Sequence, residues 1–452
     1  MRLNFALIIS IPFLFGLSSC SNLFIKEKPE YVKVSGSNFE LNGKEFYVSG
    51  SNFWYGGYLG STGETGDRDR LIRELDQMQS NGINNLRILG TSQYSIIKKS
   101  LKPAIQSAPG QFDAELLDGL DFLLSEMQKR GMRAVIFITN YWEWSGGMAQ
   151  YNAWSEGKAL PDPYESAGGF DEFMEYSASF YKNAKANDLF RKDVYSLITR
   201  KNKYSGYYYY DDPTIMTWEL ANEPRPGNPK IDNNLDAFYK WIDETSKYIH
   251  SIDPNHLVCT GSEGLVGSTA SEEVFLKAHK SQYVDYLTFH MWPKNWSWID
   301  PEKFNETYDS AKIKSIDYID KHISLARKLN KPIILEEFGI PREGAKITEN
   351  SPVTTRDRFY KEILTFVVDS AAAETPLAGF NFWGWGGEGR PKNADGMWHK
   401  GDPLTCDPPH EPQGYNSIYN TDASTLNIIK EQTERLKQLS EREIKAQKKT
   451  QP

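Results

Sequence analysis

Cysteine is scarce in this chain of 452 residues, and its scarcity excludes several classes of protein. The three cysteines, Cys20, Cys259 and Cys406, are too few for a disulfide framework, and no two have CxxC spacing. The seven histidines show neither HxH nor HExxH spacing. The sequence therefore predicts no metal site, and no motif in it indicates a cofactor.

A surplus of basic residues is also absent. The chain has 52 Lys and Arg residues against 60 Asp and Glu residues, a formal net charge of −8 at pH 7. Because phosphate binding relies on clustered Lys and Arg, this balance argues against a nucleic-acid partner. Hydrophobic residues make up 39% of the chain and aromatics 13%, which is ample for a large core and excludes wholesale disorder.

Long apolar runs are missing after the N-terminus, where residues 5–17 form a run too short to span a bilayer comfortably. This run suits a signal-peptide core, and the following Leu17-Ser18-Ser19-Cys20 is similar to a bacterial lipoprotein box. The resemblance implies a signal peptide over 1–19, lipidation of Cys20 and a polar tether over 20–30, with Ser21 favouring outer-membrane sorting. An ordinary secretory signal is the alternative. Either one predicts an extracytoplasmic protein, lipid-anchored at the outer membrane or cell surface, or secreted.

The remaining sequence alternates strand-like and helix-like segments. Eight short β-branched or aromatic runs are bounded by Gly, Pro or polar residues, over 46–53, 83–89, 133–139, 214–220, 256–260, 285–290, 332–336 and 378–383. Amphipathic stretches between and after them predict helices over 68–81, 114–130, 234–252, 315–329, 355–371 and 424–445.

Eight strand–helix pairs predict an α/β fold, a (β/α)8 TIM barrel with extended loops at its C-terminal face, spanning 31–445 before a frayed tail over 446–452. A doubly wound sheet is the rival architecture, but no GxGxxG follows the first strand and the strand count stops at eight. We find no internal repeat or long linker, and we expect a single domain and a monomer.

Two glutamates end predicted strands that face each other across such a barrel. Glu223 follows the fourth strand, and Glu337 follows the seventh. Active residues of barrel enzymes lie at the C-terminal ends of strands, and a carboxyl pair flanking a cleft is the apparatus of glycoside hydrolysis. An isolated glutamate is usually a solvated surface charge, but two at the required strand ends favour catalysis. Since adjacent strand residues point to opposite faces, the choice between Glu336 and Glu337 stays open at this point.

These stretches carry a resemblance to a known family. Glu337-Phe338-Gly339 and Trp218-Glu219-Leu220-Ala221-Asn222-Glu223-Pro224-Arg225 resemble family 5 glycoside hydrolases, retaining enzymes with a (β/α)8 fold. Three further stretches are similar to the β-mannanase branch: Tyr210-Asp211-Asp212-Pro213-Thr214-Ile215, Phe382-Trp383-Gly384-Trp385-Gly386-Gly387-Glu388-Gly389-Arg390-Pro391 and Asp407-Pro408-Pro409-His410-Glu411-Pro412-Gln413-Gly414.

The resemblance implies a role for each matched residue. Glu223 would be the acid/base and Glu337 the nucleophile, with Asn222 hydrogen-bonding the sugar 2-OH. Arg87, at the end of the second strand, matches an arginine that holds the nucleophile ionised. Alternatively, Arg87 forms a structural ion pair inside the barrel. For Asn222 the alternative role is to form the turn before Pro224.

Aromatic and histidine residues complete the expected site. His290 ends the sixth strand where the family has His-x-Tyr, but the third residue here is Trp292, whose indole N–H can donate and cannot accept. Trp292 would then stack on sugar or pack in the core. Trp383 matches the family's tryptophan floor under the cleaved sugar. Trp54 and Trp142, along with Trp144 and Trp154, are candidates for outer subsites or for loop packing. Arg200 and Asn202 resemble the branch's Arg-x-Asn, which we interpret as loop-organising.

The sequence thus predicts a retaining β-glycosidase that cleaves β-1,4-mannosidic bonds in mannan, galactomannan or glucomannan. The enzyme alternatives are an exo-acting β-mannosidase and a β-1,4-glucanase. A non-catalytic glycan-binding lipoprotein on the same scaffold is the alternative from another class.

Overall fold

Eight parallel strands form the centre of the molecule. The computed structural model describes residues 30–228, 230–231 and 234–441, and the segments predicted as signal peptide and tail lie outside this range, as does all of the tether but Glu30. The sheet runs in the order β10-β9-β8-β5-β4-β13-β12-β11. Its members are β4 (Val48–Asn52), β5 (Asn85–Leu89), β8 (Arg133–Phe137), β9 (Ile215–Glu219), β10 (Leu257–Cys259), β11 (Leu287–Met291), β12 (Ile333–Phe338) and β13 (Leu377–Phe382).

The ring closes between β10 and β11. Asp285, just before β11, donates its backbone N–H to the Val258 carbonyl at 2.8 Å, and its side chain accepts the Val258 N–H at 2.7 Å. Further along, the backbone N–H of His290 donates to the Glu263 carbonyl at 3.2 Å. The barrel predicted from the eight strand-like runs is therefore confirmed, with the strands in the expected chain order.

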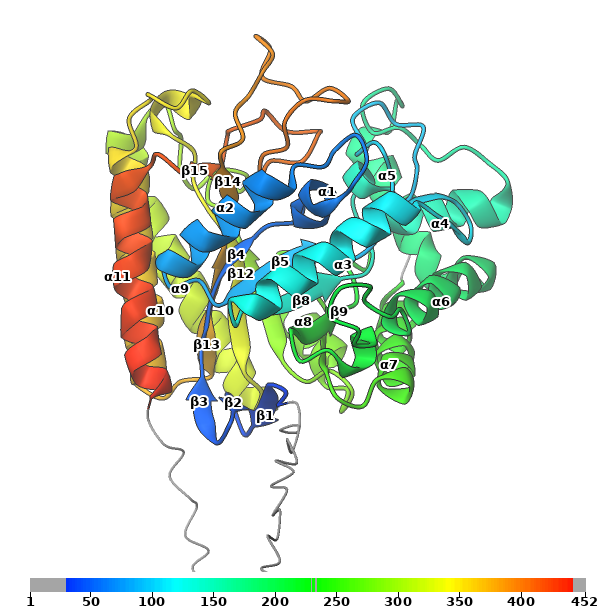
Figure 1. Cartoon of the computed structure of the whole chain (residues 1–452), viewed down its shortest axis with the longest axis horizontal. Coiled ribbons are helices and arrows are strands. Elements are labelled where there is room, and N and C mark those ends of the chain that lie inside the picture. The colour runs from blue at the N-terminus through cyan, green and yellow to red at the C-terminus, as the bar shows by residue number, and fades with distance from the viewer. Residues whose placement is uncertain (1–29, 229, 232–233, 442–452) are drawn as a thin grey trace, which may run out of the picture.

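Helices surround the barrel (Figure 1). They are α1 (Gly56–Gly60), α2 (Arg68–Ser80), α3 (Ala114–Lys129), α4 (Gly147–Glu156), α5 (Gly169–Ala178), α6 (Ala184–Ile198), α7 (Leu235–Ile252), α8 (Glu272–His279), α9 (Phe304–Leu329), α10 (Thr354–Ala372) and α11 (Ala423–Ser440), with short 3-10 turns at Glu143–Ser145, Ser179–Lys182, Tyr209–Asp211 and Glu343–Ala345. No helix in the described part of the chain is long and apolar enough to span a membrane.

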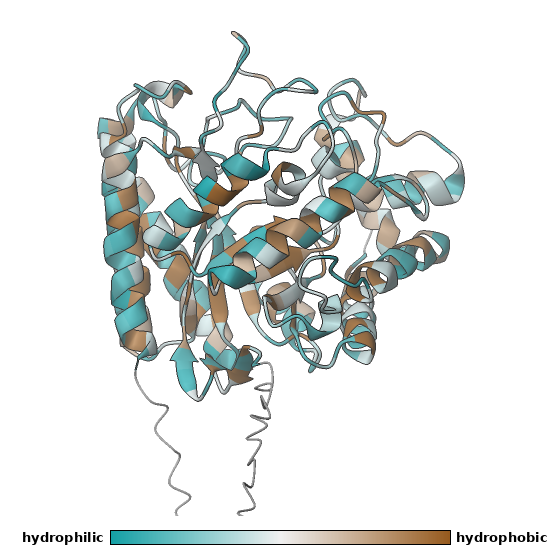
Figure 2. Cartoon of the chain, viewed as in Figure 1, coloured by the Kyte–Doolittle hydropathy of each residue, from teal (hydrophilic) through white to brown (hydrophobic). Residues whose placement is uncertain are grey.

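The long helices begin where the sequence supplies a cap and they bury one apolar stripe. Asp67 caps α2 by accepting the N–H of Arg70, and Asp113 caps α3 by accepting those of Glu115 and Leu116. Figure 2 shows the pattern, with hydrophobic residues along the strands and polar residues on the outer faces of α2, α3 and α11.

Small sheets lie at both ends of the barrel. An antiparallel sheet of β1 (Lys33–Ser35), β2 (Asn38–Leu41) and β3 (Lys44–Phe46) lies at the lower end in Figure 1. At the opposite end, a long loop over 388–417 rises above the strand ends. It joins β14 (Trp385–Gly387) to β15 (Ile418–Tyr419), while β6 (Gln106–Ala108) and β7 (Gln111–Phe112) form a hairpin.

Several element boundaries differ from the predicted ones. The first strand was expected over 46–53, but Phe46 ends β3, and the barrel strand begins at Val48. Helix α9 begins at Phe304, eleven residues before the predicted start, because polar residues in its first turns mask the periodicity. Helices α1, α4, α5, α6 and α8 were not predicted; α4 is buried over most of its length and so lacks a polar stripe.

Candidate active site

The carboxyl ends of the barrel strands open into a cavity of about 560 Å³. Glu223, after β9, and Glu337, in β12, both line it. One oxygen of each carboxylate and a ring nitrogen of His290 lie within 4.8 Å of one another. The two glutamates are 7% and 3% exposed. The opposed pair expected from the sequence is therefore present in one buried pocket.

The backbone at Glu223 adopts an unusual conformation that aims its side chain. Its φ is +52°, in the left-handed region that non-glycine residues rarely occupy. The backbone N–H donates to the Gly261 carbonyl at 2.9 Å, which fixes the turn. Such local strain persists where the surrounding structure over-determines it, and it is common at active sites.

Arg87 of β5 lies beneath the carboxylates and uses all five of its N–H groups. Two of them pair with the Glu219 carboxylate, at 2.6 and 3.0 Å, and one donates to Glu337. The remaining two donate to the side-chain oxygens of Asn52 at 3.0 Å and Asn222 at 2.8 Å. The predicted contact with the nucleophile candidate is present, and so is the structural ion pair that was its alternative, with Glu219 as partner.

His290 of β11 bridges the two carboxylates. Its Nδ1 lies 2.6 Å from Glu223 Oε1 and 3.1 Å from Glu337 Oε2. Burial disfavours the charged ring, but the charge of Glu337 and the contacts with Glu223 and Glu336 outweigh it and raise the pKa of His290 well above its usual value. The imidazole is thus protonated, and Nδ1 donates to the carboxylates.

Glu223 has three stabilising neighbours in its ionised state. Burial by itself would raise its pKa, but the hydrogen bond and charge of His290, the charge of Arg225 and the Trp142 N–H lower the pKa to about 2. The Trp142 indole donates to Glu223 Oε2 at 2.6 Å. The lowered pKa of Glu223 and the raised pKa of His290 thus favour the proton of this pair on His290, one hydrogen bond away from Glu223.

Tryptophans form part of the wall. Trp142, Trp144, Trp292 and Trp383 all line the cavity, and Trp292 packs edge-on against Trp383 with ring centroids 5.9 Å apart. The indole N–H of Trp383 is buried without a hydrogen-bond partner among the described residues. Trp292 makes no hydrogen bond to either carboxylate in the described structure, so it does not take over the contact of the family tyrosine.

Two of the expected tryptophans lie elsewhere. Trp54 is 1% exposed, donates its N–H to the Cys406 carbonyl at 2.6 Å and packs on Trp144, so it belongs to the core and the predicted outer subsite is wrong. Trp154 packs edge-on against Tyr151, away from the cavity lining. Arg200 pairs with Asp121 at 2.7 Å and Asn202 accepts the N–H of Tyr204, which agrees with their predicted loop-organising role.

Further acidic and basic residues of the cavity were not singled out from the sequence. Glu143, Glu263, Arg225, His410 and Glu411 line it, all from loops at the mouth. Burial and the charge of Glu223 raise the pKa of Glu263 to about 7 against the attraction of Arg225. Burial and the charges of Asp407, Glu337 and Glu223 raise the pKa of Glu411 to about 8. Arg225 ends the stretch that resembles family 5, and His410 and Glu411 stand within a mannanase-like stretch, which was the available signal.

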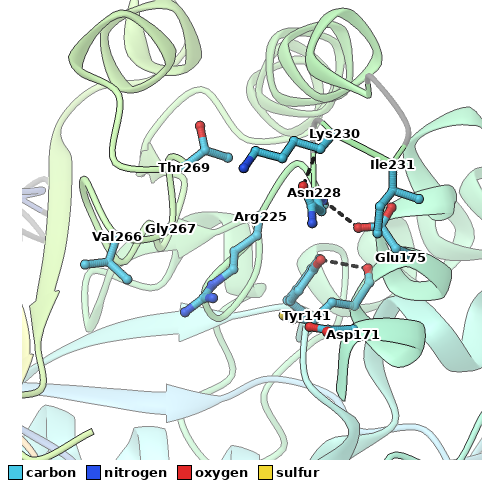
Figure 3. A pocket seen from close by; sticks show the side chains of 12 residues that line it. Tyr141, Asp171, Glu175, Arg225, Asn228, Lys230, Ile231, Val266, Gly267 and Thr269 are labelled. Carbon is cyan, nitrogen blue, oxygen red and sulfur yellow. Dashed lines mark hydrogen bonds between the residues drawn. The ribbon is translucent and has the colours of Figure 1, made fainter. Parts of the chain in front are cut away.

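A second cavity of about 400 Å³, drawn in Figure 3, lies next to the first. Arg225 and Met174 line both cavities. Arg225 donates to Glu263, and its guanidinium lies 4.8 Å from the centre of the Trp142 ring. The wall between the two cavities is thus a cationic group held between a carboxylate and an indole. Asn228 donates its backbone N–H to Glu175 on the far side.

Two groups of side chains in the described structure have donor atoms close enough to hold a metal ion. They are Glu223, His290 and Glu337, and, deeper in the barrel, Glu219, Cys259 and Glu336. Arg87 contacts glutamates of both groups and supplies the compensating positive charge. With that charge in place, the donor sets fit a network of ion pairs better than a metal centre.

Comparison with known proteins identifies the family. A family model described as GH family 5 beta-mannosidase-like matches residues 29–441. The chain is 27% identical to mannan endo-1,4-beta-mannosidase 4 of Solanum lycopersicum, over 91% of this chain and 92% of that protein.

Solved structures are similar over the whole barrel. The crystal structure of a glycoside hydrolase family 5 mannosidase from Rhizomucor miehei matches with a TM-score of 0.84 and 33% identity, covering 91% of this chain and 99% of that one. The X-ray structure of the endo-beta-1,4-mannanase from Thermotoga petrophila matches with a TM-score of 0.61 and 25% identity, covering 87% and 78%. The resemblance inferred from the sequence is confirmed: the chain belongs to glycoside hydrolase family 5 and is a glycoside hydrolase.

Proposed function

We propose that this enzyme hydrolyses β-1,4-mannosidic bonds in mannan, galactomannan or glucomannan with retention of configuration. The carrying observation is the carboxylate pair, whose facing oxygens lie within 4.8 Å. Retaining glycosidases have carboxyl groups about 5–5.5 Å apart, whereas inverting ones need about 6.5–9.5 Å. The substrate follows from the relatives, since a protein named as a mannan endo-1,4-beta-mannosidase matches 91% of the chain.

In the first step Glu337 is the nucleophile and Glu223 the acid. The Glu337 carboxylate forms a bond to the anomeric carbon while the bond from that carbon to the glycosidic oxygen breaks. The leaving oxygen takes the proton of the Glu223 carboxyl group, which receives it from His290 Nδ1 across their 2.6 Å contact. Arg87 contacts Glu337 and keeps it ionised until it attacks.

In the second step water replaces the enzyme at the anomeric carbon. Glu223, now ionised, takes a proton from the water as its oxygen bonds to the anomeric carbon and the bond to Glu337 breaks. The proton then returns to His290, which restores the starting state. The donors around Glu223 keep it ionised for this role as base.

Two neighbours suit the sugar. Asn222 lies beside Glu223 with its oxygen held by Arg87 and its NH₂ directed at Asn140 Oδ1 at 3.1 Å, which fixes the amide for a contact to the sugar 2-OH. Trp383 offers an apolar indole face for the pyranose ring at the cavity floor.

Product analysis tests the substrate class. We expect the enzyme to release manno-oligosaccharides from linear mannan and galactomannan and to leave carboxymethylcellulose intact. A β-glucanase would give the opposite result, and an exo-acting mannosidase would release mannose alone.

Two variants test the roles of the glutamates. Glu223→Gln should lower kcat on unactivated mannan by at least about 10³-fold while oligosaccharide binding persists, because only the proton donor is lost. Glu337→Ala should be inactive, with activity partly restored by azide to give an inverted glycosyl azide. If azide restores activity to Glu336→Ala and not to Glu337→Ala, then Glu336 is the nucleophile.

We further propose that Cys20 carries a lipid that anchors the enzyme to the bacterial outer membrane. The support is the lipoprotein-like stretch Leu17-Ser18-Ser19-Cys20, followed by Ser21. Expression of the full chain and of Cys20→Ser, followed by fractionation, tests this: the wild type should sediment with membranes and the variant should not. Equal partitioning of the two would contradict the anchor.

A further inference from the structure

A bulge in β12 gives the site a residue that regular strand alternation would have turned away. In the register with β11, Leu335 lies opposite Phe289 and Glu337 lies opposite His290, so Glu336 is the extra residue. Glu336 and Glu337 therefore both lie toward the barrel axis. Each contacts Arg87 and His290, Glu336 at 3.7 and 3.5 Å.

The Glu336 carboxyl group is fully buried and accepts no hydrogen bond from the described residues. Titratable groups on four other strands or strand ends face it: Arg87, Glu219, Cys259, Tyr286 and His290. An ionised carboxylate in such a place costs several kcal/mol unless a charged donor compensates it.

Most of these neighbours have no charged donor to give, since a neutral thiol or hydroxyl offers only an uncharged S–H or O–H. Arg87 already spends its five N–H groups on Glu219, Glu337 and two asparagines. Burial raises the pKa of the Cys259 thiol and of the Tyr286 hydroxyl well above their usual values, so both stay neutral. His290 Nε2 is the remaining charged donor among the described residues, and it too has no other hydrogen-bond partner.

We propose that Glu336 is a positioning residue that pairs with His290 Nε2 and thereby keeps the Nδ1–H of that ring directed between Glu223 and Glu337. The order Glu336–His290–Glu223 would make the histidine the proton store of the acid/base. This inference rests on the proposed function for its catalytic consequence, but the Glu336–His290 contact is independent of the substrate.

The proton balance of this arrangement closes over one turnover. With both nitrogens protonated, His290 gives its Nδ1 proton to Glu223 and becomes the neutral ring with a proton on Nε2. The Glu336 carboxylate stabilises that tautomer by accepting the Nε2–H. When Glu223 takes a proton from water in the second step, it returns one proton to Nδ1.

A titration of the ring nitrogens in the unliganded full-length enzyme tests the contact without any substrate. With ¹⁵N-histidine labelling and His290→Asn to assign its signals, His290 should stay doubly protonated well above pH 7. In Glu336→Gln the midpoint should fall by about one pH unit or more, because the amide keeps the volume and loses the charge. Glu336→Asp should keep most of the wild-type midpoint.

Kinetics test the catalytic consequence. For Glu336→Gln we expect kcat/KM on mannobiose to fall by about tenfold or more and its alkaline limb to shift to lower pH. Hydrolysis of 2,4-dinitrophenyl β-mannoside, whose leaving group needs little protonation, should change much less. Glu74→Gln, which removes a buried carboxylate paired with Arg70 outside the cavity lining, controls for general destabilisation.

Each result bears on the proposal. A wild-type His290 that titrates near pH 6.5, or a midpoint unmoved in Glu336→Gln, would overturn it even if no variant were active. Equal losses on both substrates with an unmoved alkaline limb would reduce Glu336 to a structural residue. If the midpoint shifts as expected and the wild type hydrolyses no mannoside, the contact stands and the proposed function fails.

Discussion

At the scale of single residues, hydrogen-bond donors and positive charges determine the pKa of the acid/base candidate, Glu223. Glu223 lies in a dry pocket that by itself favours the neutral acid, yet His290, Arg225 and Trp142 reverse that preference. The Trp142 N–H is the one of these three contacts that can be removed without removing a charge. It therefore offers a clean measure of how tightly the shared proton is held.

We expect Trp142→Phe to shift the alkaline limb of kcat/KM upward by about one pH unit. A hydrogen bond to a charged group is worth about 1.5–3 kcal/mol, and one pH unit corresponds to about 1.4 kcal/mol. Loss of the N–H favours the protonated acid, so the pair of Glu223 and His290 releases its proton at higher pH. The pH profile on mannobiose is the measurement.

Trp292→Phe is the matched control. Trp292 lines the same cavity without donating to a carboxylate, so its change should affect KM and leave the limb in place. An unmoved limb in Trp142→Phe, or equal shifts in both variants, would contradict the assigned role of the indole N–H.

Site residues near strand ends were predictable from the sequence, whereas the side-chain directions that irregular backbone imposes were not. Asn222, Glu223, His290 and Glu337 meet because parallel strands bring their carboxyl ends together, and Arg87, expected at a strand end, reaches them from the middle of β5. The inward turn of Glu336 depends on a bulge that alternation cannot reveal. Trp54 follows its strand directly, and the sequence gives no sign that its indole turns into the core.

At the scale of elements, the loop between β14 and β15 carries a carboxyl group with a strongly raised pKa. Glu411 of this loop lies within the field of Asp407, Glu223 and Glu337, and its side chain is 27% exposed. The pKa of Glu411 is raised to about 8 from an ordinary value of 4.5. The folded state therefore holds a proton that the unfolded chain releases at lower pH.

This difference predicts a pH-dependent stability of the enzyme. Between about pH 4.5 and 8 the unfolded chain binds fewer protons at Glu411 than the folded enzyme, so stability falls as pH rises through this window. Glu411→Gln abolishes this proton uptake. We expect its melting temperature to match the wild type near pH 4.5 and to exceed it by a few degrees at pH 8.

Thermal unfolding of both proteins between pH 4 and 9 checks this expectation. Glu302→Gln, a change at an exposed glutamate, is the control and should give a difference from the wild type that does not vary with pH. A Glu411→Gln difference that is flat or falls with pH would show that the loop holds this carboxylate ionised.

Helices with an aspartate N-cap were predicted to within a residue, as for α2 and α3, and α10 was predicted equally well although its N-cap residue makes no side-chain hydrogen bond. The helices within 147–198 were not predicted from the sequence. They pack against one another as well as against the barrel. There α4 contacts α5 and α6, so that apolar residues face several directions. A periodic stripe marks a helix with one buried face, which α4 lacks. Helix α6 does bury such a stripe, with Phe190, Val194 and Leu197 on it, so its pattern was present in the sequence and was missed.

At the scale of the whole molecule, the barrel closes between β10, its shortest strand, and β11. Strand β10 has three residues, and it pairs with β9 along one edge. On the other edge Asp285 makes a two-part contact with Val258, through its backbone N–H and through its side chain. A side chain thus takes part in the ladder here, as Asn84 does between β4 and β5, where its side chain accepts the Ser49 N–H at 2.9 Å.

We expect Asp285→Ala to lower the free energy of unfolding by about 1–3 kcal/mol, because the Val258 N–H is left buried without an acceptor. Asp285 Oδ2 also lies 3.1 Å from His250 Nε2 at the end of α7, so His250→Ala is the matched control that removes this contact and keeps the one to Val258.

Urea unfolding gives the free energy of unfolding of both variants, and hydrogen exchange at the Val258 amide reports directly on the contact between β10 and Asp285. Asp285→Ala should accelerate that exchange far more than His250→Ala. If the two variants lose equal stability and the Val258 amide exchanges alike in both, the side chain of Asp285 acts through His250, and the ring is held by its backbone contacts.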